Sequence, residues 1–171
     1  AQVNRNLVMG NLRLIYLGRL IQHQKRIFDL CDFVVRLNEL RINCTLTIAG
    51  EGEDASELIR QLSGLHGTAI ISFLGRLTHE QAMNELAQND ILVLFSDHEG
   101  LPIVLLEALM RGVVPIVSKI QSGISEILEH DINSLMFPVG APRIAADLVA
   151  SISADHSKLS QLKSNAEHLG R

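Results

Sequence analysis

Short apolar runs alternate with longer, more polar segments along the whole chain. The runs have the length of strands, and the longer segments are expected to be helices. The expected strands are Leu12–Leu17, Cys44–Ala49, Ala69–Leu74, Ile91–Phe95, Val113–Ser118 and Ser134–Pro138. The expected helices are Ile27–Leu40, Asp54–Leu62, Thr78–Gln88, Pro102–Arg111, Gly123–Glu129 and a pair between Ala141 and Leu169 that is divided near Ser153–His156.

Local signals mark where some of these helices begin and end. Thr78 and Gln81 have the spacing of a capping box, in which each side chain bonds the other residue's backbone N–H. Pro102 stands at the expected first position of its helix, and Gly112 follows its end. This placement is the common asymmetry of helix termini.

Strands this apolar are covered on both faces, and a helix follows each of them. The pattern therefore predicts right-handed crossovers between neighbouring parallel strands. The expected fold class is α/β, a Rossmann-like, doubly wound, mostly parallel six-stranded sheet with helices on both faces. The 171 residues fit one domain, without an internal repeat or an interdomain linker.

Composition narrows the class of function. The chain is 47% hydrophobic, which excludes a disordered segment, and its net charge of −4 disfavours a nucleic-acid binder. Its longest apolar stretch, Ile103–Val117, is interrupted by charges and is too short for a transmembrane segment, and the first ten residues lack a signal-peptide pattern. Cys31 and Cys44 have no metal-binding or disulfide spacing, so we expect a reducing, cytoplasmic compartment.

Two cations follow the first expected strand. In an open α/β sheet, ligands bind outside the carboxyl ends of the strands. Arg19 directly follows Leu12–Leu17, and Lys25 lies six residues further on. Such a pair suits a diphosphate, which needs charge neutralisation and donors at fixed reach. Two solvated surface charges would have the same spacing, so both interpretations stay open.

The turn Gly50-Glu51-Gly52 lies between a strand and a helix, as in dinucleotide-binding motifs. However, Glu51, Glu53 and Asp54 would surround the place of a pyrophosphate. We interpret the segment as a tight turn whose acidic residues complement the helix dipole.

The segment 96–108 carries the most chemistry. Glu99 lies in a strand-end loop, and Glu107 lies among apolar residues of the next helix, where a carboxylate needs a donor. Sugar hydroxyls, a buried arginine or backbone amides would serve. Gly100 would allow a close backbone approach, and the N–H groups after Pro102 would face an anion. A polar turn followed by one solvent-facing glutamate is the alternative.

No other motif for catalysis is present. The 7 histidines have no metal-binding spacing, and no hydrolase nucleophile motif occurs. His98, beside Glu99, is interpreted as a loop residue.

The run Ser96-x-x-Glu99-Gly100-Leu101-Pro102, with Leu106-Glu107-Ala108, resembles the E-x7-E signature of a known enzyme class. These are retaining, nucleotide-sugar-dependent glycosyltransferases of the two-domain GT-B architecture, of the glycogen-synthase and bacterial mannosyl- and glucosyltransferase type. The other matching segments, in order, are Gly18-Arg19 with Lys25, Ala49-Gly50-Glu51-Gly52, Phe73-Leu74-Gly75, Asp90-Ile91-Leu92-Val93, Gly112-Val113-Val114-Pro115, Gly123 with Glu126, and Asn133.

The resemblance implies roles for these residues. It implies that Arg19 and Lys25 hold the donor's diphosphate and that Glu107 takes the ribose hydroxyls. Glu99 would lie near the transferred sugar, so that the catalytic residues would be Glu99, Arg19 and Lys25. The remaining implied donor contacts are the backbone of Gly100 and Leu101 beside the sugar, Gly75, Arg76 and Leu77 at the nucleobase, and Pro102 and Ile103. It implies a nucleoside-diphosphate sugar as donor substrate, no further cofactor and no metal.

Four positions depart from the family pattern. Arg26 stands where the family often has glycine, and Phe95 where it commonly has proline. Ser122 and Ser134 replace glycines. Ser122 leaves the shape of the phosphate-side loop least determined.

In such enzymes this is the C-terminal, donor-binding half. We therefore expect residues 1–171 to be one such domain of a bacterial polysaccharide or glycolipid enzyme, with the N-terminal acceptor domain absent. The expected partners are the donor, that domain and an acceptor glycan or lipid, with membrane association only peripheral and through that domain. The chain by itself is expected not to transfer sugar. The alternatives are a sugar-nucleotide epimerase half of the same architecture and a non-catalytic nucleotide-binding module.

Overall fold

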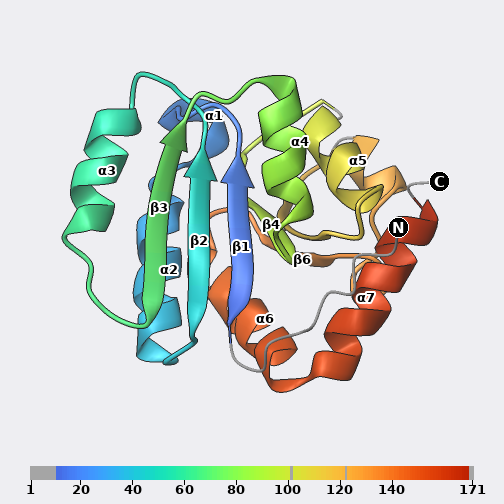
Figure 1. Ribbon diagram of the computed structural model, residues 1–171. Helices are drawn as coiled ribbons and strands as arrows, with labels where there is room; N and C mark the ends of the chain where they lie inside the picture. Colours follow the sequence, from blue (N-terminus) through green and yellow to red (C-terminus); the bar gives the residue numbers. More distant parts are fainter. Residues whose placement is uncertain (1–10, 101, 122, 170–171) are drawn as a thin grey trace.

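Six parallel strands form the centre of the computed structural model, which describes residues 11–100, 102–121 and 123–169 (Figure 1). Their order is β3-β2-β1-β4-β5-β6, and each pair of neighbours is parallel. The strands are β1 (Leu12–Leu17), β2 (Cys44–Ala49), β3 (Ala69–Gly75), β4 (Ile91–Leu94), β5 (Val114–Lys119) and β6 (Leu135–Pro138). The Rossmann-like prediction is confirmed.

Helices cover both faces of the sheet (Figure 1). They are α1 (Gln22–Lys25), α2 (Asp29–Glu39), α3 (Ala55–Ser63), α4 (His79–Ala87), α5 (Ile103–Leu109), the 3₁₀ turn η1 (Gly123–Glu126), α6 (Pro142–Ala154) and α7 (His156–Leu169). On one face α2 packs against α6 and α3, and on the other α5 packs against α4 and α7. None of the described helices has the length and apolar character needed to cross a membrane.

Several expected boundaries were wrong by a few residues. The helix expected from Ile27 begins at Asp29, and the helix expected over Gly123–Glu129 is a single 3₁₀ turn. Pro102 precedes α5 in an extended conformation instead of forming its first residue. The largest omission is α1, a four-residue helix in a segment that was expected to be a loop.

The core explains one departure from the family pattern. The ring of Phe95 lies between Phe33 of α2 and Phe137 of β6, with centroids 5.4 Å apart in both pairs. Because Phe95 is fully buried there, it joins a helix to an edge strand of the sheet. A proline at this position could not make these ring contacts.

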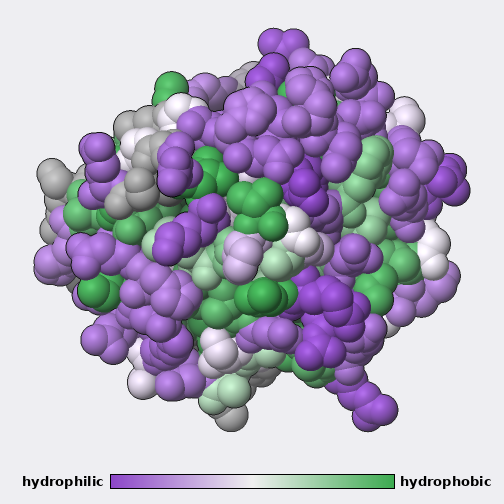
Figure 2. Space-filling view, turned by 180° about the vertical axis from the view of Figure 1, so that it is seen from behind, coloured by the Kyte–Doolittle hydropathy of each residue, from purple (hydrophilic) through white to green (hydrophobic). Residues whose placement is uncertain are grey.

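Charged groups join α2 and α6 at the surface. Arg36 Nε lies 2.9 Å from Asp147 Oδ1, and Arg143 pairs with Glu39. The molecule seen from behind is mostly hydrophilic, with smaller apolar patches between the charged side chains (Figure 2).

Asp90 ties three elements together at the amino ends of the strands. Its buried carboxylate accepts from the backbone N–H of Arg13 at 3.0 Å, from the Arg13 guanidinium at 3.1 Å and from Lys163 Nζ at 2.5 Å. Burial would raise the pKa of Asp90, but the hydrogen bonds from Arg13 and Lys163 outweigh it and hold that pKa below its ordinary value. The group therefore fastens α7 to β1 and β4.

The chain reverses its winding between β1 and β4. From β1 it proceeds outward through β2 to β3, and from β4 it proceeds in the opposite direction through β5 to β6. The loops after β1 and β4 consequently leave the sheet in opposite directions, and a crevice forms between them.

Candidate functional site

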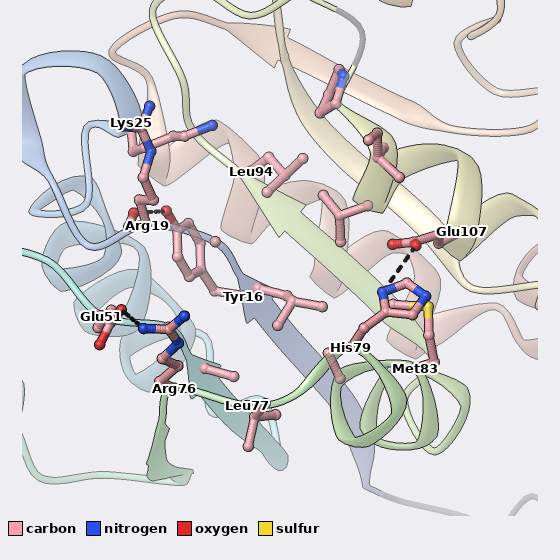
Figure 3. Close-up of a pocket in the computed structure, with 18 of the residues that line it drawn as sticks. Tyr16, Arg19, Lys25, Glu51, Arg76, Leu77, His79, Met83, Leu94 and Glu107 are labelled. Carbon is pink, nitrogen blue, oxygen red and sulfur yellow. Dashed lines mark hydrogen bonds and ion pairs between the residues drawn. The ribbon is translucent and has the colours of Figure 1, made fainter.

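A cavity of about 660 Å³ opens at this crevice (Figure 3). The residues that line it come from the carboxyl ends of β1, β2 and β4, from the loops that follow β1 to β4, and from α1, α4 and α5. The expected site residues among them are Arg19, Lys25, Arg76, Leu77, Glu99, Pro102, Ile103 and Glu107. Residues that are widely separated in the sequence therefore surround one space.

Some expected contacts do not line the cavity. Gly75 and Gly100 are not among the lining residues, and Leu101 lies outside the described part of the chain. Gly75 adopts φ +67° at the end of β3, and its carbonyl accepts from Gly50 N–H at 2.8 Å. Its observed role is thus a left-handed turn that supports the neighbouring loop.

Lys25 and Glu99 meet at the crevice. Lys25 Nζ donates to Glu99 Oε1, and the same oxygen accepts from Ser96 Oγ at 2.6 Å. The Lys25 and Glu99 side chains are 14% and 9% exposed. Two residues that were expected at the diphosphate and at the sugar therefore form one nearly buried ion pair.

Arg19 lies nearby and makes a different kind of contact. Its Nη2 donates to the side-chain oxygen of Gln24 at 2.8 Å, so the guanidinium contacts a neutral amide. The backbone carbonyl of Arg19 accepts from Tyr16 OH at 2.8 Å (Figure 3). Burial, reinforced by Glu99 and opposed by Arg19, raises the pKa of Tyr16 far above its ordinary value, so Tyr16 keeps the proton that it donates.

Glu107 faces the cavity from the opposite wall (Figure 3). Its side chain is 17% exposed, and Oε1 lies 3.7 Å from Nδ1 of His79, the first residue of α4. Arg111, one turn along the helix, donates to the Glu107 backbone carbonyl. The Glu107 carboxylate is therefore nearly buried and directed toward a space that a ligand's hydroxyl groups could enter.

An apolar surface adjoins Glu107. Leu77, Ala82 and Met83 line the cavity near the start of α4, and Leu94 and Val104 line it near β4 and α5. Arg76 lies at the margin, where its guanidinium pairs with Glu51 at 3.0 Å and both side chains are largely exposed. One part of the cavity is thus charged and the other apolar.

The Gly50-Glu51-Gly52 turn packs against the loop after β1. A Cβ on Gly50 would lie 1.8 Å from the carbonyl oxygen of Gly18, and a Cβ on Gly52 would lie 2.2 Å from that of Leu20. The glycines therefore allow two loops to touch, as expected for a tight turn. However, Asp54 makes no side-chain cap to α3 and instead accepts from Gln22 N–H of α1 at 2.7 Å.

Arg26 ends α1 in the left-handed region, with φ +48°. This backbone conformation favours glycine, which fits the glycine of the family pattern noted in the sequence analysis. The Arg26 side chain bonds Asp29 at 2.8 Å and Asp97 at 3.2 Å. Those bonds attach the end of α1 to the loop that carries Glu99.

The arrangement suits an anionic ligand that also carries hydroxyl groups. Arg19 and Lys25 supply positive charge, and Glu107 and Glu99 supply hydrogen-bond acceptors. Within the described ranges, no group of three or more His, Cys, Asp or Glu side chains is arranged to hold a metal ion.

Tyr16, Gln24 and His79 are contacts that sequence reasoning missed. The capping box at Thr78 is present, with Gln81 N–H donating to Thr78 Oγ1 at 3.2 Å. It could have placed His79 at the helix start on the ligand side of the sheet. Tyr16 and Gln24 have no comparable local signal.

The family model described as glycosyl transferases group 1 matches residues 3–169. The chain belongs to this family. A relative, the glycogen synthase of Mycobacterium tuberculosis, is 34% identical over 143 residues, which are 84% of this chain and 33% of that protein. The lipopolysaccharide 1,6-galactosyltransferase of Escherichia coli K12 is 33% identical over 74% of this chain and 35% of its own length. The chain thus spans about a third of the length of these relatives.

Solved structures of other proteins share the fold. The Anabaena protein HepE, in complex with UDP and glucose, superposes with a TM-score of 0.81 at 22% identity, covering 94% of this chain and 44% of that one. The C-terminal domain of LpcC from Francisella tularensis, a group 1 family protein, gives a TM-score of 0.77 at 20% identity and covers 94% of this chain and 85% of that chain.

Proposed function

We propose that the cavity binds the nucleoside-diphosphate sugar donor of a retaining glycosyltransferase, which moves the sugar to a glycan or lipid acceptor. The observation that carries the proposal is that one cavity, at the switch point of the sheet, brings together the cations Arg19 and Lys25 with the carboxylates Glu99 and Glu107. This set matches the chemistry of the donor, whose diphosphate is anionic and whose ribose and sugar carry hydroxyl groups.

Arg19 and Lys25 would neutralise the diphosphate as it leaves the sugar. Fixed cations stabilise a developing negative charge most effectively in a site from which water is excluded. To reach a phosphate oxygen, Lys25 would exchange part of its contact with Glu99. The freed Glu99 carboxylate would then be available to accept from a sugar hydroxyl.

The opposite part of the cavity suits the nucleoside. Glu107 would accept from the ribose hydroxyls. The apolar side chains of Leu77, Ala82 and Met83 would cover one side of the nucleobase, and the backbone of Arg76 and Leu77 would contact its edge.

Comparison with relatives supports a transferase rather than the epimerase alternative. The chain belongs to a glycosyl transferase family, and its relatives include a glycogen synthase and a galactosyltransferase. The Anabaena neighbour was solved with UDP and glucose, which makes UDP the first ligand to test.

We also propose that a second domain closes the cavity and holds the acceptor. This part of the proposal rests on the chain's span of about a third of its relatives. Positioning of two reactants can lower a barrier by about 7–11 kcal/mol, and a cavity open on one side cannot position an acceptor. The 171-residue chain should therefore bind donor but transfer no sugar at a measurable rate.

A thermal-shift panel of UDP-, GDP- and ADP-sugars tests the donor site. A ligand that binds only the folded state raises its apparent stability by RT ln(1 + [L]/Kd), which is about 2.7 kcal/mol at a concentration of 100 Kd. We expect the nucleotide sugars that share one base to raise the midpoint temperature of unfolding. A panel in which no compound moves the midpoint would contradict the proposed donor site.

A further inference from the structure

Gln24 lies between the two loops that build the charged part of the cavity. Its side-chain oxygen accepts from Arg19 Nη2 at 2.8 Å, and its side-chain nitrogen makes a longer contact, 3.4 Å, with the carbonyl oxygen of His98. Its backbone carbonyl accepts from Asp97 N–H at 2.9 Å. Gln24 therefore touches both Arg19 and the loop that carries Glu99.

The helix that presents Gln24 is held at both ends. At its start, the Asp54 carboxylate accepts from Gln22 N–H, and at its end Arg26 bonds Asp29 and Asp97. A four-residue helix has little stability of its own, so these contacts determine where it lies. The position of Gln24 is consequently well defined by its surroundings.

The chemistry of the amide matters because Arg19 must keep its charge for a ligand. Lys25 is already paired with Glu99. A carboxylate at position 24 would pair with Arg19 in the same way and would compete with a phosphate. A neutral amide accepts from the guanidinium and leaves the net positive charge in place, and its NH₂ group can donate to the His98 carbonyl.

We propose that Gln24 is a positioning residue, which directs the Arg19 guanidinium into the cavity and links it to the Glu99 loop without neutralising it. The inference rests on the proposed function, since it assigns Arg19 to the donor's diphosphate. Gln24 itself acts through Arg19 and contacts no donor atom.

Isothermal titration calorimetry of the 171-residue chain with UDP, and with GDP and ADP in parallel, tests this role. UDP lacks the transferred sugar, so its affinity reports on Arg19 rather than on Glu99. Gln24→Met keeps a side chain of similar length but removes its hydrogen bonds. We expect this variant to bind the tightest of the three ligands about threefold to tenfold more weakly. Gln24→Glu adds a competing charge and should weaken binding more than about tenfold.

Stability and additivity separate positioning from a general structural effect. Gln24 is half-buried on a surface helix, so both variants should unfold within about 2 °C of the original chain. In an Arg19→Met background, Gln24→Met should change affinity by less than about twofold, because the group it positions is gone. Gln88→Glu, the same change of charge on an exposed residue outside the cavity, should leave affinity unchanged.

The outcomes distinguish this inference from the proposed function. If the original chain binds none of the three diphosphates, both are overturned. If Arg19→Met weakens binding while both Gln24 variants bind normally, the role of Gln24 is overturned and the donor site stands. A loss of affinity on Gln24→Met that is equally large with Arg19 and with Arg19→Met would also overturn the role of Gln24.

Discussion

Lys25 and Glu99, 74 positions apart in the chain, form an ion pair where the sheet reverses its winding. Lys25 follows β1, Glu99 follows β4, and these two strands are neighbours in the centre of the sheet. The pair connects the part of the cavity assigned to the diphosphate with the part assigned to the sugar. Its two members should therefore respond differently to substitution.

Replacement of either cation should weaken binding of a nucleoside diphosphate. Arg19→Met and Lys25→Met each remove one charge-assisted contact, at a cost of about 1.5–3 kcal/mol in binding free energy. Arg19 is exposed, so its loss should leave stability unchanged, whereas Lys25→Met leaves the buried Glu99 carboxylate without its cation and should lower the free energy of unfolding. Calorimetry and urea unfolding measure the two effects.

The double variant Lys25→Met with Glu99→Gln is the control for this comparison. It removes the unpaired charge, so stability should recover while diphosphate binding stays weak. Unchanged affinity in both single variants would remove Arg19 and Lys25 from the site.

Substitutions of the two glutamates should affect the binding of different ligands. Glu107→Gln should weaken UDP and UDP-sugar alike, because both carry the ribose. Glu99→Gln should reduce affinity for the UDP-sugar while changing UDP affinity little, because UDP lacks the transferred sugar that Glu99 would contact. Parallel titrations with both ligands give the comparison, and equal losses of UDP affinity in the two variants would contradict the division of roles.

Removal of divalent metal should leave donor binding unchanged. Arg19 and Lys25 supply the charge that a diphosphate requires, and the described residues offer no cluster of metal ligands. We expect the same UDP affinity, within about twofold, in about 1 mM EDTA and in about 5 mM magnesium chloride. A tenfold loss in EDTA would show that a metal bridges the diphosphate and the protein.

The sequence was sufficient to predict the strands, because their apolar runs have the length of strands and are separated by clear helical segments. It also placed Arg19, Lys25 and Glu99 at strand ends, where ligands bind. It could not show that Lys25 and Glu99 pair, because alternating strands and helices do not determine which strands are neighbours.

Other features could not be predicted from the sequence, for reasons that are specific to each site. Helix α1 has four residues, too few for a hydrophobic period to be visible, and it depends on Asp54, 32 positions away from Gln22. The left-handed backbone of Arg26 is stabilised by its bonds to two aspartates, and no rule of residue preference would place an arginine there.

Asp90 should make a pH-dependent contribution to stability at the other end of the sheet. Its pKa is lowered in the folded state, so the stabilisation is present above its unfolded value of about 4 and is lost as the pH falls through the folded value. Asp90→Asn should cost about 2–3 kcal/mol at pH 7, because it removes the bonds to Arg13 and Lys163.

Urea unfolding of the original chain and of Asp90→Asn between pH 7 and pH 3 gives the test. The difference in free energy between the two should narrow as the pH falls below about 4. Donor affinity at pH 7 serves as the control and should be equal in both, since Asp90 lies outside the cavity. A constant difference over the whole range would refute the assignment.

A crystal structure of the chain with the nucleoside diphosphate that stabilises it most would test the donor site most directly. We expect the diphosphate between Arg19 and Lys25, with Lys25 moved from Glu99 toward a phosphate oxygen, and the ribose hydroxyls on Glu107. A diphosphate bound away from the crevice between β1 and β4, or in the crevice with its ribose far from Glu107, would contradict the proposed site.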